Sequence, residues 1–73
     1  MSSFSENLKL LRKQNNVTQK VVASAIEVTE RNYQRYEAGT QQPTLPVLVA
    51  LADYFSVTID FLVGRADEDG RDE

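Results

Sequence analysis

The chain has 73 residues and a formal net charge of −3, and it contains neither cysteine nor histidine. These absences exclude disulfide bonds, zinc sites built on either residue, and catalytic triads or nucleophiles that depend on them, so we expect no metal, no cofactor and no enzymatic activity. A hydrophobic content of 41% is typical of one small folded domain, and because no apolar run approaches the ~18 residues of a membrane span, the cytoplasm is the expected location.

Five short helices are predicted along the chain, and each opens on a serine or threonine whose side chain can cap it. The capping residues are Ser3, Thr18, Thr29, Thr44 and Thr58. The helices that follow them run from Phe4 to the pair Asn15 and Asn16, over Gln19–Ile26, over Glu30–Glu37, through Pro46 to Phe55, and over Ile59–Val63. Apolar residues recur at helical spacing, and no segment alternates with a strand period for more than a few residues. The sequence therefore predicts an all-α domain.

Acidic residues concentrate at the C-terminal end of the chain. Six basic residues balance six acidic residues through Gly64, whereas residues 65–73 hold two basic and five acidic residues and so carry the whole net charge of −3. This end has no apolar residue after Ala66. We expect residues 1–64 to form the domain and residues 65–73 to form an acidic disordered tail or the start of a linker. Such a tail either repels a negatively charged partner or serves solubility alone.

The third predicted helix has one polar face, made of Glu30, Arg31, Gln34 and Arg35. At about 100° per residue, Tyr33 and Tyr36 occupy the opposite arc and are expected in the core. The outer side chains suit base edges, since arginine can bind guanine, glutamine adenine and glutamate the cytosine amine. Two short helices joined by a tight turn, the second with such a face, can place that helix in a DNA major groove. A solvent-exposed helix face is the simpler interpretation of the same residues.

A longer pattern decides between these interpretations. It consists of Leu8, Leu11 and Arg12, then Val17, Thr18, Gln19, Val22, Ala23, Ile26, Val28 and Thr29, then Tyr36, Glu37, Gly39, Pro43 and Leu45, then Leu51, Ala52, Phe55 and Val57. This pattern resembles the lambda-repressor-like, Cro-type helix-turn-helix family of bacterial and phage transcriptional regulators. The resemblance implies a five-helix domain that binds a double-stranded DNA operator through its third helix, as a transcriptional regulator that we expect to be a repressor.

The resemblance also implies roles for individual residues. Base contacts are expected from Glu30, Arg31, Gln34 and Arg35, although Arg35 lies at the edge of the face and can reach a phosphate instead. Phosphate contacts are expected from Gln19, Lys20, Thr29, Thr40 and Gln41. In this family the glutamine matched by Gln19 also braces the third helix, and the alternative is an ordinary exposed polar residue. The loop that contains Thr40 and Gln41 is otherwise a plain turn.

Two further residues match a structural pair, and one departs from the family. Arg12 and Glu37 correspond to a recurrent ion pair between the first and third helices, so we keep them out of the base-reading set. The family usually has glycine in the turn between the second and third helices, where this chain has Glu27. Either the turn differs locally, or Glu27 adopts a left-handed backbone at a cost of ~1 kcal/mol.

The fourth and fifth predicted helices hold more apolar residues than a small core can bury. The candidates for a homodimer interface are Val49, Tyr54, Ile59, Phe61, Leu62 and Val63, some of which must belong to the core. A palindromic operator with half-sites one duplex turn apart would match such a dimer. The alternative function is a protein-interaction module of the same fold, an antitoxin-like or antirepressor-like partner whose acidic tail engages a basic protein.

Overall fold

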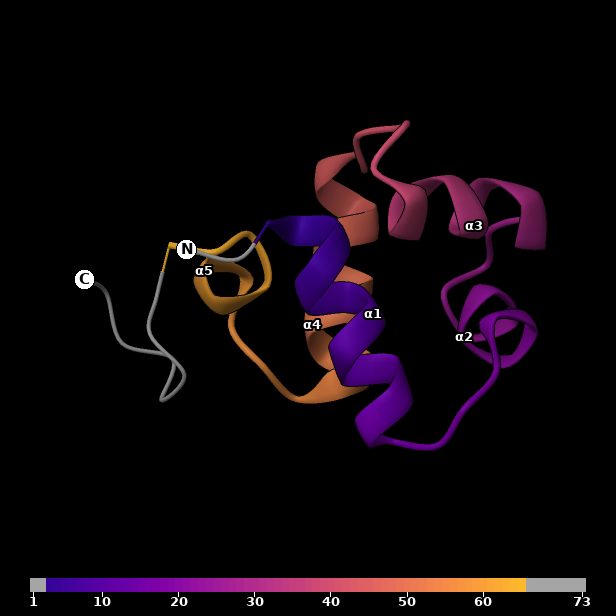
Figure 1. Ribbon diagram of the computed structural model, residues 1–73, viewed down its shortest axis with the longest axis horizontal. Helices are drawn as coiled ribbons and strands as arrows, with labels where there is room; N and C mark the ends of the chain where they lie inside the picture. The colour runs from indigo at the N-terminus through magenta and orange to yellow at the C-terminus, as the bar shows by residue number, and fades with distance from the viewer. Residues whose placement is uncertain (1–2, 66–73) are drawn as a thin grey trace.

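Serine and threonine residues begin all five helices of the computed structural model, which describes residues 3–65 (Figure 1). Within these residues the helices are α1 (Phe4–Gln14), α2 (Gln19–Ala25), α3 (Glu30–Ala38), α4 (Leu45–Phe55) and α5 (Ile59–Leu62), and there is no strand. The predicted all-α fold is therefore confirmed. The tail predicted at residues 65–73 lies, apart from Arg65, outside the described part of the chain.

The helix starts follow from the local sequence. Each capping hydroxyl accepts a hydrogen bond from the backbone N–H three residues later, as in the 3.1 Å bond from Val21 N to Thr18 Oγ1. A cap of this kind stabilises a helix by about 1 kcal/mol. The helix ends differ from the predictions by one residue, because α2 stops at Ala25, α5 stops at Leu62 and α3 continues to Ala38.

The core lies where the five helices meet. In Figure 1, α1 crosses the centre of the view, with α5 at one end of the molecule and α2 with α3 at the other. Each helix contributes one completely buried side chain: Leu8, Val22, Tyr33, Leu51 and Leu62. Full burial of one such apolar side chain contributes ~1.5–3 kcal/mol. Because α3 packs against both α1 and α2, only its outer face is left free.

The amide of one buried polar residue ties α1 to α5. Asn7 is only 7% exposed, and its Nδ2 donates to the carbonyl oxygens of Phe61 at 3.1 Å and Leu62 at 3.3 Å. These carbonyls belong to the last turn of α5, where the helix itself provides no partner for them.

Among residues 3–65, no helix is both long enough and apolar enough to cross a membrane.

The turn between α2 and α3 keeps a left-handed backbone although it lacks glycine. Glu27 has a φ of 62°, so the second of the two possibilities left by the sequence is the correct one. A residue with a Cβ atom is disfavoured in this conformation by ~1 kcal/mol or more. The turn nevertheless forms, because the buried contacts of α2 and α3 on either side of it fix the path of the chain.

Candidate nucleic-acid interface

The outer face of α3 is free, as its helical period predicts. All four polar residues of this face are exposed: Glu30, Arg31, Gln34 and Arg35. On the inner side, Tyr33 is 0% exposed and Tyr36 is 4% exposed. The Thr29 cap at the start and the left-handed Gly39 at the end, with a φ of 78°, limit α3 to nine residues. A helix of this length is roughly 13 Å long and 10–12 Å wide with its side chains, so it fits a major groove ~12 Å across.

A shallow open hollow lies beside the first turn of α3, where α1, α2 and α3 meet. It has a volume of about 530 Å³ and is lined by Arg12, Lys13, Asn16, Val17, Thr18, Gln19, Lys20 and Glu30. We call it the basic hollow, since three of these side chains are positive and one is negative. Two of the predicted phosphate contacts, Gln19 and Lys20, lie here together with Glu30, a predicted base contact. Lys13 and Asn16 also line it, although neither is among the DNA contacts that the sequence predicts.

The other predicted phosphate contacts lie at the two ends of α3. Thr29 accepts a hydrogen bond from Asn32 N at 3.1 Å, so its oxygen caps the helix. Thr40 lies just beyond the opposite end, where its backbone N–H donates to the carbonyl of Arg35 at 3.1 Å. Thr40 is exposed and Gln41 is half-buried. The predicted phosphate contacts therefore bracket the outer face of α3.

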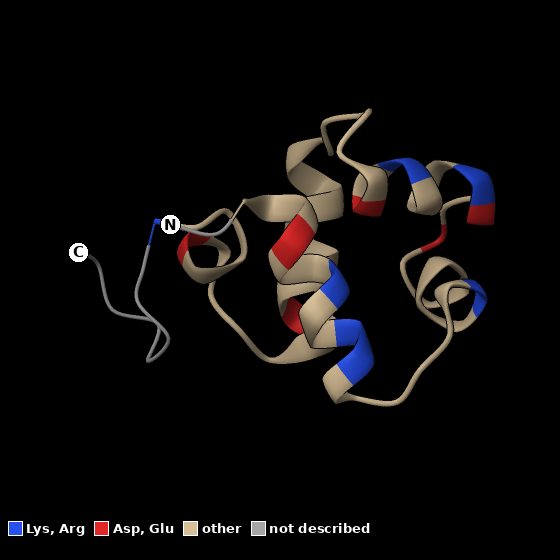
Figure 2. Cartoon of the chain, viewed as in Figure 1, with Lys and Arg blue, Asp and Glu red and all other residues tan. Residues whose placement is uncertain are grey.

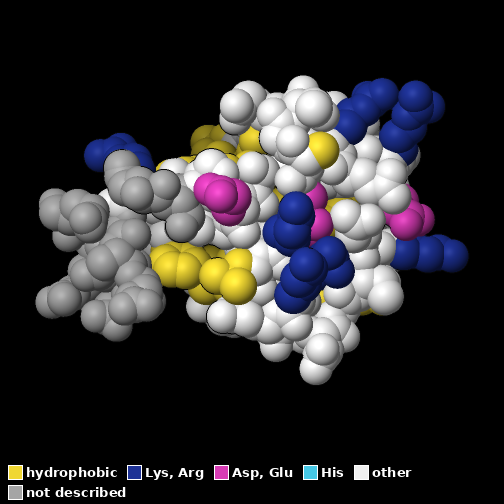
Figure 3. All heavy atoms as spheres, in the orientation of Figure 1, with side chains coloured by type: hydrophobic (Ala, Val, Ile, Leu, Met, Phe, Trp, Pro, Cys, Tyr) yellow, Lys and Arg dark blue, Asp and Glu magenta, His cyan; other side chains and the backbone are white. Residues whose placement is uncertain are grey.

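Charge is unevenly distributed over the domain. Through Gly64, every lysine and arginine lies on α1, α2 or α3, whereas Asp53 and Asp60 lie on α4 and α5 (Figure 2). Figure 3 shows basic side chains gathered over α1 and projecting from the end of the molecule that α2 and α3 form. The part of the chain from α1 to α3 also holds Glu6, Glu27, Glu30 and Glu37, so it carries a net charge of +2, which the −2 of α4 and α5 balances.

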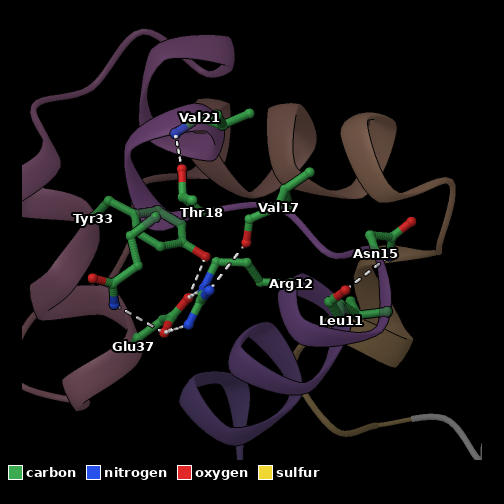
Figure 4. A network of polar contacts seen from close by, with 9 residues as sticks. Leu11, Arg12, Asn15, Val17, Thr18, Val21, Tyr33 and Glu37 are labelled. Carbon is green, nitrogen blue, oxygen red and sulfur yellow. Dashed lines mark hydrogen bonds and ion pairs between the residues drawn. The ribbon is translucent and has the colours of Figure 1, made fainter.

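The carboxylate of Glu37 joins the three helices at this end (Figure 4). Its Oε2 accepts hydrogen bonds from Arg12 Nε at 2.6 Å and from the Tyr33 hydroxyl at 2.5 Å. Its Oε1 accepts hydrogen bonds from Arg12 Nη2 at 3.2 Å and from Gln19 Nε2 at 3.1 Å. Arg12 Nη1 also donates to the carbonyl of Val17 at 3.1 Å. The ion pair expected between Arg12 and Glu37 is thus present, with side-chain exposures of 16% and 3%.

Hydrogen bonds keep Glu37 ionised in spite of its burial. Burial alone would raise the pKa of this carboxyl, but the hydrogen bonds from Arg12, Tyr33 and Gln19 outweigh it and hold the pKa below its ordinary value. The hydrogen bond to Glu37 raises the pKa of Arg12 in turn. Burial, followed by the bond to Glu37, raises the pKa of Tyr33. At neutral pH the network therefore consists of one cation, one anion and two neutral donors.

Gln19 is half-buried and bonded to α3 rather than freely exposed. This excludes the alternative of an ordinary exposed polar residue and agrees with the bracing role that the resemblance implied. The Tyr33 hydroxyl is a further member of this network, whereas the helical period predicted only that Tyr33 lies in the core. A signal was available, because Tyr33 and Glu37 are four residues apart and therefore share one helix face.

The apolar residues of α4 and α5 divide between core and surface. Leu62 is 0% exposed, so it is one of the candidates that belong to the core and not to an interface. Val49 is 42% exposed and Tyr54 is 37% exposed, while Ile59, Phe61 and Val63 are half-buried. Leu45, one turn before Val49 on α4, is 66% exposed and was missed.

Comparisons with known proteins agree with this architecture. A family model described as Helix-turn-helix matches residues 8–62. The uncharacterized HTH-type transcriptional regulator YqaE of Bacillus subtilis is 36% identical over 66 residues, which cover 89% of this chain and 57% of the relative. The cryptic phage CTXphi transcriptional repressor RstR of Vibrio cholerae is 38% identical over 68 residues, which cover 93% of this chain and 61% of the relative. The chain thus spans less than two thirds of each relative.

A solved structure shares the fold at lower sequence identity. The P22 c2 repressor, crystallised with a synthetic operator, superposes with a TM-score of 0.82 at 19% identity, covering 86% of this chain and 96% of that chain. At this identity the likeness concerns the fold, and it confirms the predicted repressor-like arrangement of helices.

Proposed function

Because this chain belongs to the helix-turn-helix family, we propose that it is a sequence-specific DNA-binding transcriptional regulator whose α3 enters the major groove of an operator. The observation that carries this proposal is the free polar face of α3 beside the basic hollow. Side chains that can hydrogen-bond to base edges therefore lie next to a surface that can bind phosphate. DNA readers combine these two kinds of contact, because phosphate contacts orient the protein and base contacts specify the sequence.

The outer face of α3 supplies the base contacts in this proposal. Arg31 and Gln34 lie on its first two turns. Arginine can form two hydrogen bonds to guanine, and glutamine can form two to adenine. Glu30, which also lines the basic hollow, accepts a hydrogen bond from a cytosine amine. Arg35 lies one turn after Arg31 and reaches either a base or a phosphate.

The phosphate contacts come from the rim of α3. Gln19 and Lys20 in the basic hollow, together with Thr29, bind one stretch of the DNA sugar-phosphate backbone. Thr40 and Gln41 bind a second stretch beyond the C-terminal end of α3. Each phosphate that a cation neutralises contributes about −0.9 to the slope of log affinity against log salt. Loss of Lys20 therefore lowers the magnitude of that slope by about one unit.

We further propose that the protein is a repressor and that it acts as a homodimer in the bacterial cytoplasm, where its operator lies. The name of RstR, a transcriptional repressor, supports the first point. The exposed Leu45 and Val49 on α4, together with the half-buried Ile59 on α5, support the second, because exposed large apolar side chains gain stability when a partner covers them.

Binding-site selection from a random duplex pool tests the proposed function. The parent protein is expected to enrich one sequence class, and Arg31→Ala or Gln34→Ala to lose discrimination at one or two positions, at ~1–3 kcal/mol for each bidentate contact. Lys20→Ala is expected to weaken binding to all sequences about equally. The matched controls are Gln14→Ala and Lys9→Ala, which alter exposed α1 residues outside the basic hollow. A parent that enriches no duplex contradicts the proposal and favours the protein-interaction alternative.

A further inference from the structure

We propose that Tyr33 is a positioning residue for DNA binding, because its hydroxyl fixes the Glu37 carboxylate that holds the Gln19 amide at the basic hollow. The inference rests on the proposed function and adds to it a residue that touches no DNA. Tyr33 is 0% exposed, so any effect of its hydroxyl on DNA affinity must pass through the residues that it contacts. Among residues 3–65 the hydroxyl of Tyr33 donates its hydrogen bond to Glu37 Oε2.

The two carboxylate oxygens of Glu37 accept hydrogen bonds from different sets of donors. Oε2 receives Arg12 Nε and the Tyr33 hydroxyl, and Oε1 receives Arg12 Nη2 and Gln19 Nε2. Arg12 binds both oxygens and so aligns the carboxylate with its guanidinium plane, but its contact to Oε1 is long, at 3.2 Å. The Tyr33 hydroxyl bonds Oε2 alone, from within α3. This second, short contact holds Oε2 against α3, and because the carboxylate is rigid it sets, together with Arg12, where Oε1 meets Gln19.

The Gln19 amide links this buried network to the basic hollow. One N–H of Nε2 is directed to Glu37, and the side chain also lines the hollow. A carboxylate accepts hydrogen bonds only, so it selects the amide orientation in which nitrogen faces α3. The remaining N–H is the group that a phosphate oxygen requires, because phosphate also only accepts hydrogen bonds from this amide. When Oε1 moves, the amide loses its fixed donor geometry.

A double-mutant cycle between Tyr33→Phe and Gln19→Ala tests this coupling in DNA binding. In the parent background, Gln19→Ala is expected to weaken operator affinity about fivefold, the effect of one hydrogen bond. In the Tyr33→Phe background, the same substitution is expected to weaken affinity less than twofold, because the amide has already lost its fixed position. Tyr33→Phe alone is expected to leave the preferred sequence unchanged.

Tyr36→Phe is the matched control. Tyr36 lies on the same helix and is 4% exposed, but its hydroxyl takes no part in the Glu37 network. In the Tyr36→Phe background, Gln19→Ala should keep its full effect. Should Tyr33→Phe fail to fold, both backgrounds are rebuilt on Glu27→Gly, which relieves the left-handed turn between α2 and α3.

A second readout follows the same coupling without DNA. The side-chain amide signals of Gln19 in a ¹H–¹⁵N NMR spectrum of the free protein are expected to shift in Tyr33→Phe and to stay in place in Tyr36→Phe. Unshifted Gln19 signals, or a fivefold effect of Gln19→Ala in both backgrounds, overturn the inference and leave the proposed function standing. A parent protein that selects no operator overturns the proposed function, and this inference with it.

Discussion

Glu37 shows how one buried carboxylate can define a surface. It is 5% exposed, and it accepts hydrogen bonds from Arg12 on α1, Gln19 on α2 and Tyr33 on its own helix. Removal of a donor leaves a buried charge partly unsatisfied, which costs more than the intact pair contributes. The network therefore makes the relative positions of α1, α2 and α3 depend on a few specific side chains.

Loss of the Arg12 side chain should destabilise the domain strongly. Arg12→Ala removes two of the four hydrogen bonds to Glu37 and its only cationic partner in the network. We expect the free energy of unfolding to fall by about 3 kcal/mol, the lower end of the range for breaking a buried pair, because Arg12 is partly open to solvent. Urea unfolding measures this change. Lys13→Ala, the exposed neighbour on α1, should stay within about 0.5 kcal/mol of the parent. An unchanged urea midpoint in Arg12→Ala would show that the pair is incidental.

The stability contributed by Glu37 should depend on pH in a defined direction. Its folded pKa is below its ordinary value of 4.5, so the folded state holds a proton less tightly than the unfolded chain does. The contribution is therefore fully present above the ordinary pKa and is lost as the pH falls through the folded value.

Unfolding free energies of the parent and Glu37→Gln, measured across this range, test that direction. Glu37→Gln should be clearly less stable than the parent near neutral pH, and the difference should shrink as the pH falls below 4.5. Asp53→Asn, which neutralises an exposed acid on α4, should show only a small difference throughout. A difference for Glu37→Gln that is the same at every pH argues against an ionised, hydrogen-bonded carboxylate.

At the scale of the elements, the turn between α2 and α3 can be improved. Glycine adopts a left-handed backbone without the Cβ penalty that Glu27 bears, although it loses more conformational freedom on folding. The net expectation for Glu27→Gly is a gain of up to about 1 kcal/mol in the free energy of unfolding. Ala25→Gly, two residues earlier in α2, should lose up to about 1 kcal/mol. Thermal unfolding compares the two variants, and a destabilised Glu27→Gly would mean that the Glu27 side chain contributes a contact of its own.

The helices were predictable because their signals are local. A capping hydroxyl and the N–H that it binds lie three residues apart, so the sequence alone contains the information for each helix start. The hydrogen bonds from Asn7 to the carbonyls of α5 join residues more than fifty positions apart, and an asparagine within a helix does not by itself indicate such a partner. The same holds for the bond from Gln19 to Glu37, which a family resemblance implied only as bracing.

For the whole molecule, the distribution of charge matters more than its total. The six basic residues through Gly64 lie on α1, α2 and α3, and one of them, Arg12, is neutralised by Glu37. The positive charge of this part of the chain therefore rests on few free cations, so the electrostatic attraction to DNA of any sequence is small. In the proposed function, affinity would then depend on base contacts and on two copies bound at adjacent half-sites, since two linked contacts bind far more tightly than one.

A second copy would bind over the exposed Leu45 and Val49 of α4 and the half-buried Ile59 of α5. Leu45 and Val49 are 66% and 42% exposed, they lie one turn apart on α4, and this side of the molecule lacks the basic residues of α1–α3. An aspartate placed there would bury a charge in the contact and should separate the copies. We expect the parent to sediment as a dimer at high micromolar concentration and Val49→Asp as a folded monomer. Val21→Asp is the matched control, because Val21 is a valine of 48% exposure on α2 and its replacement should leave the dimer intact. A parent that is monomeric at that concentration contradicts the predicted interface, and operator binding would then have to assemble the two copies on the DNA itself.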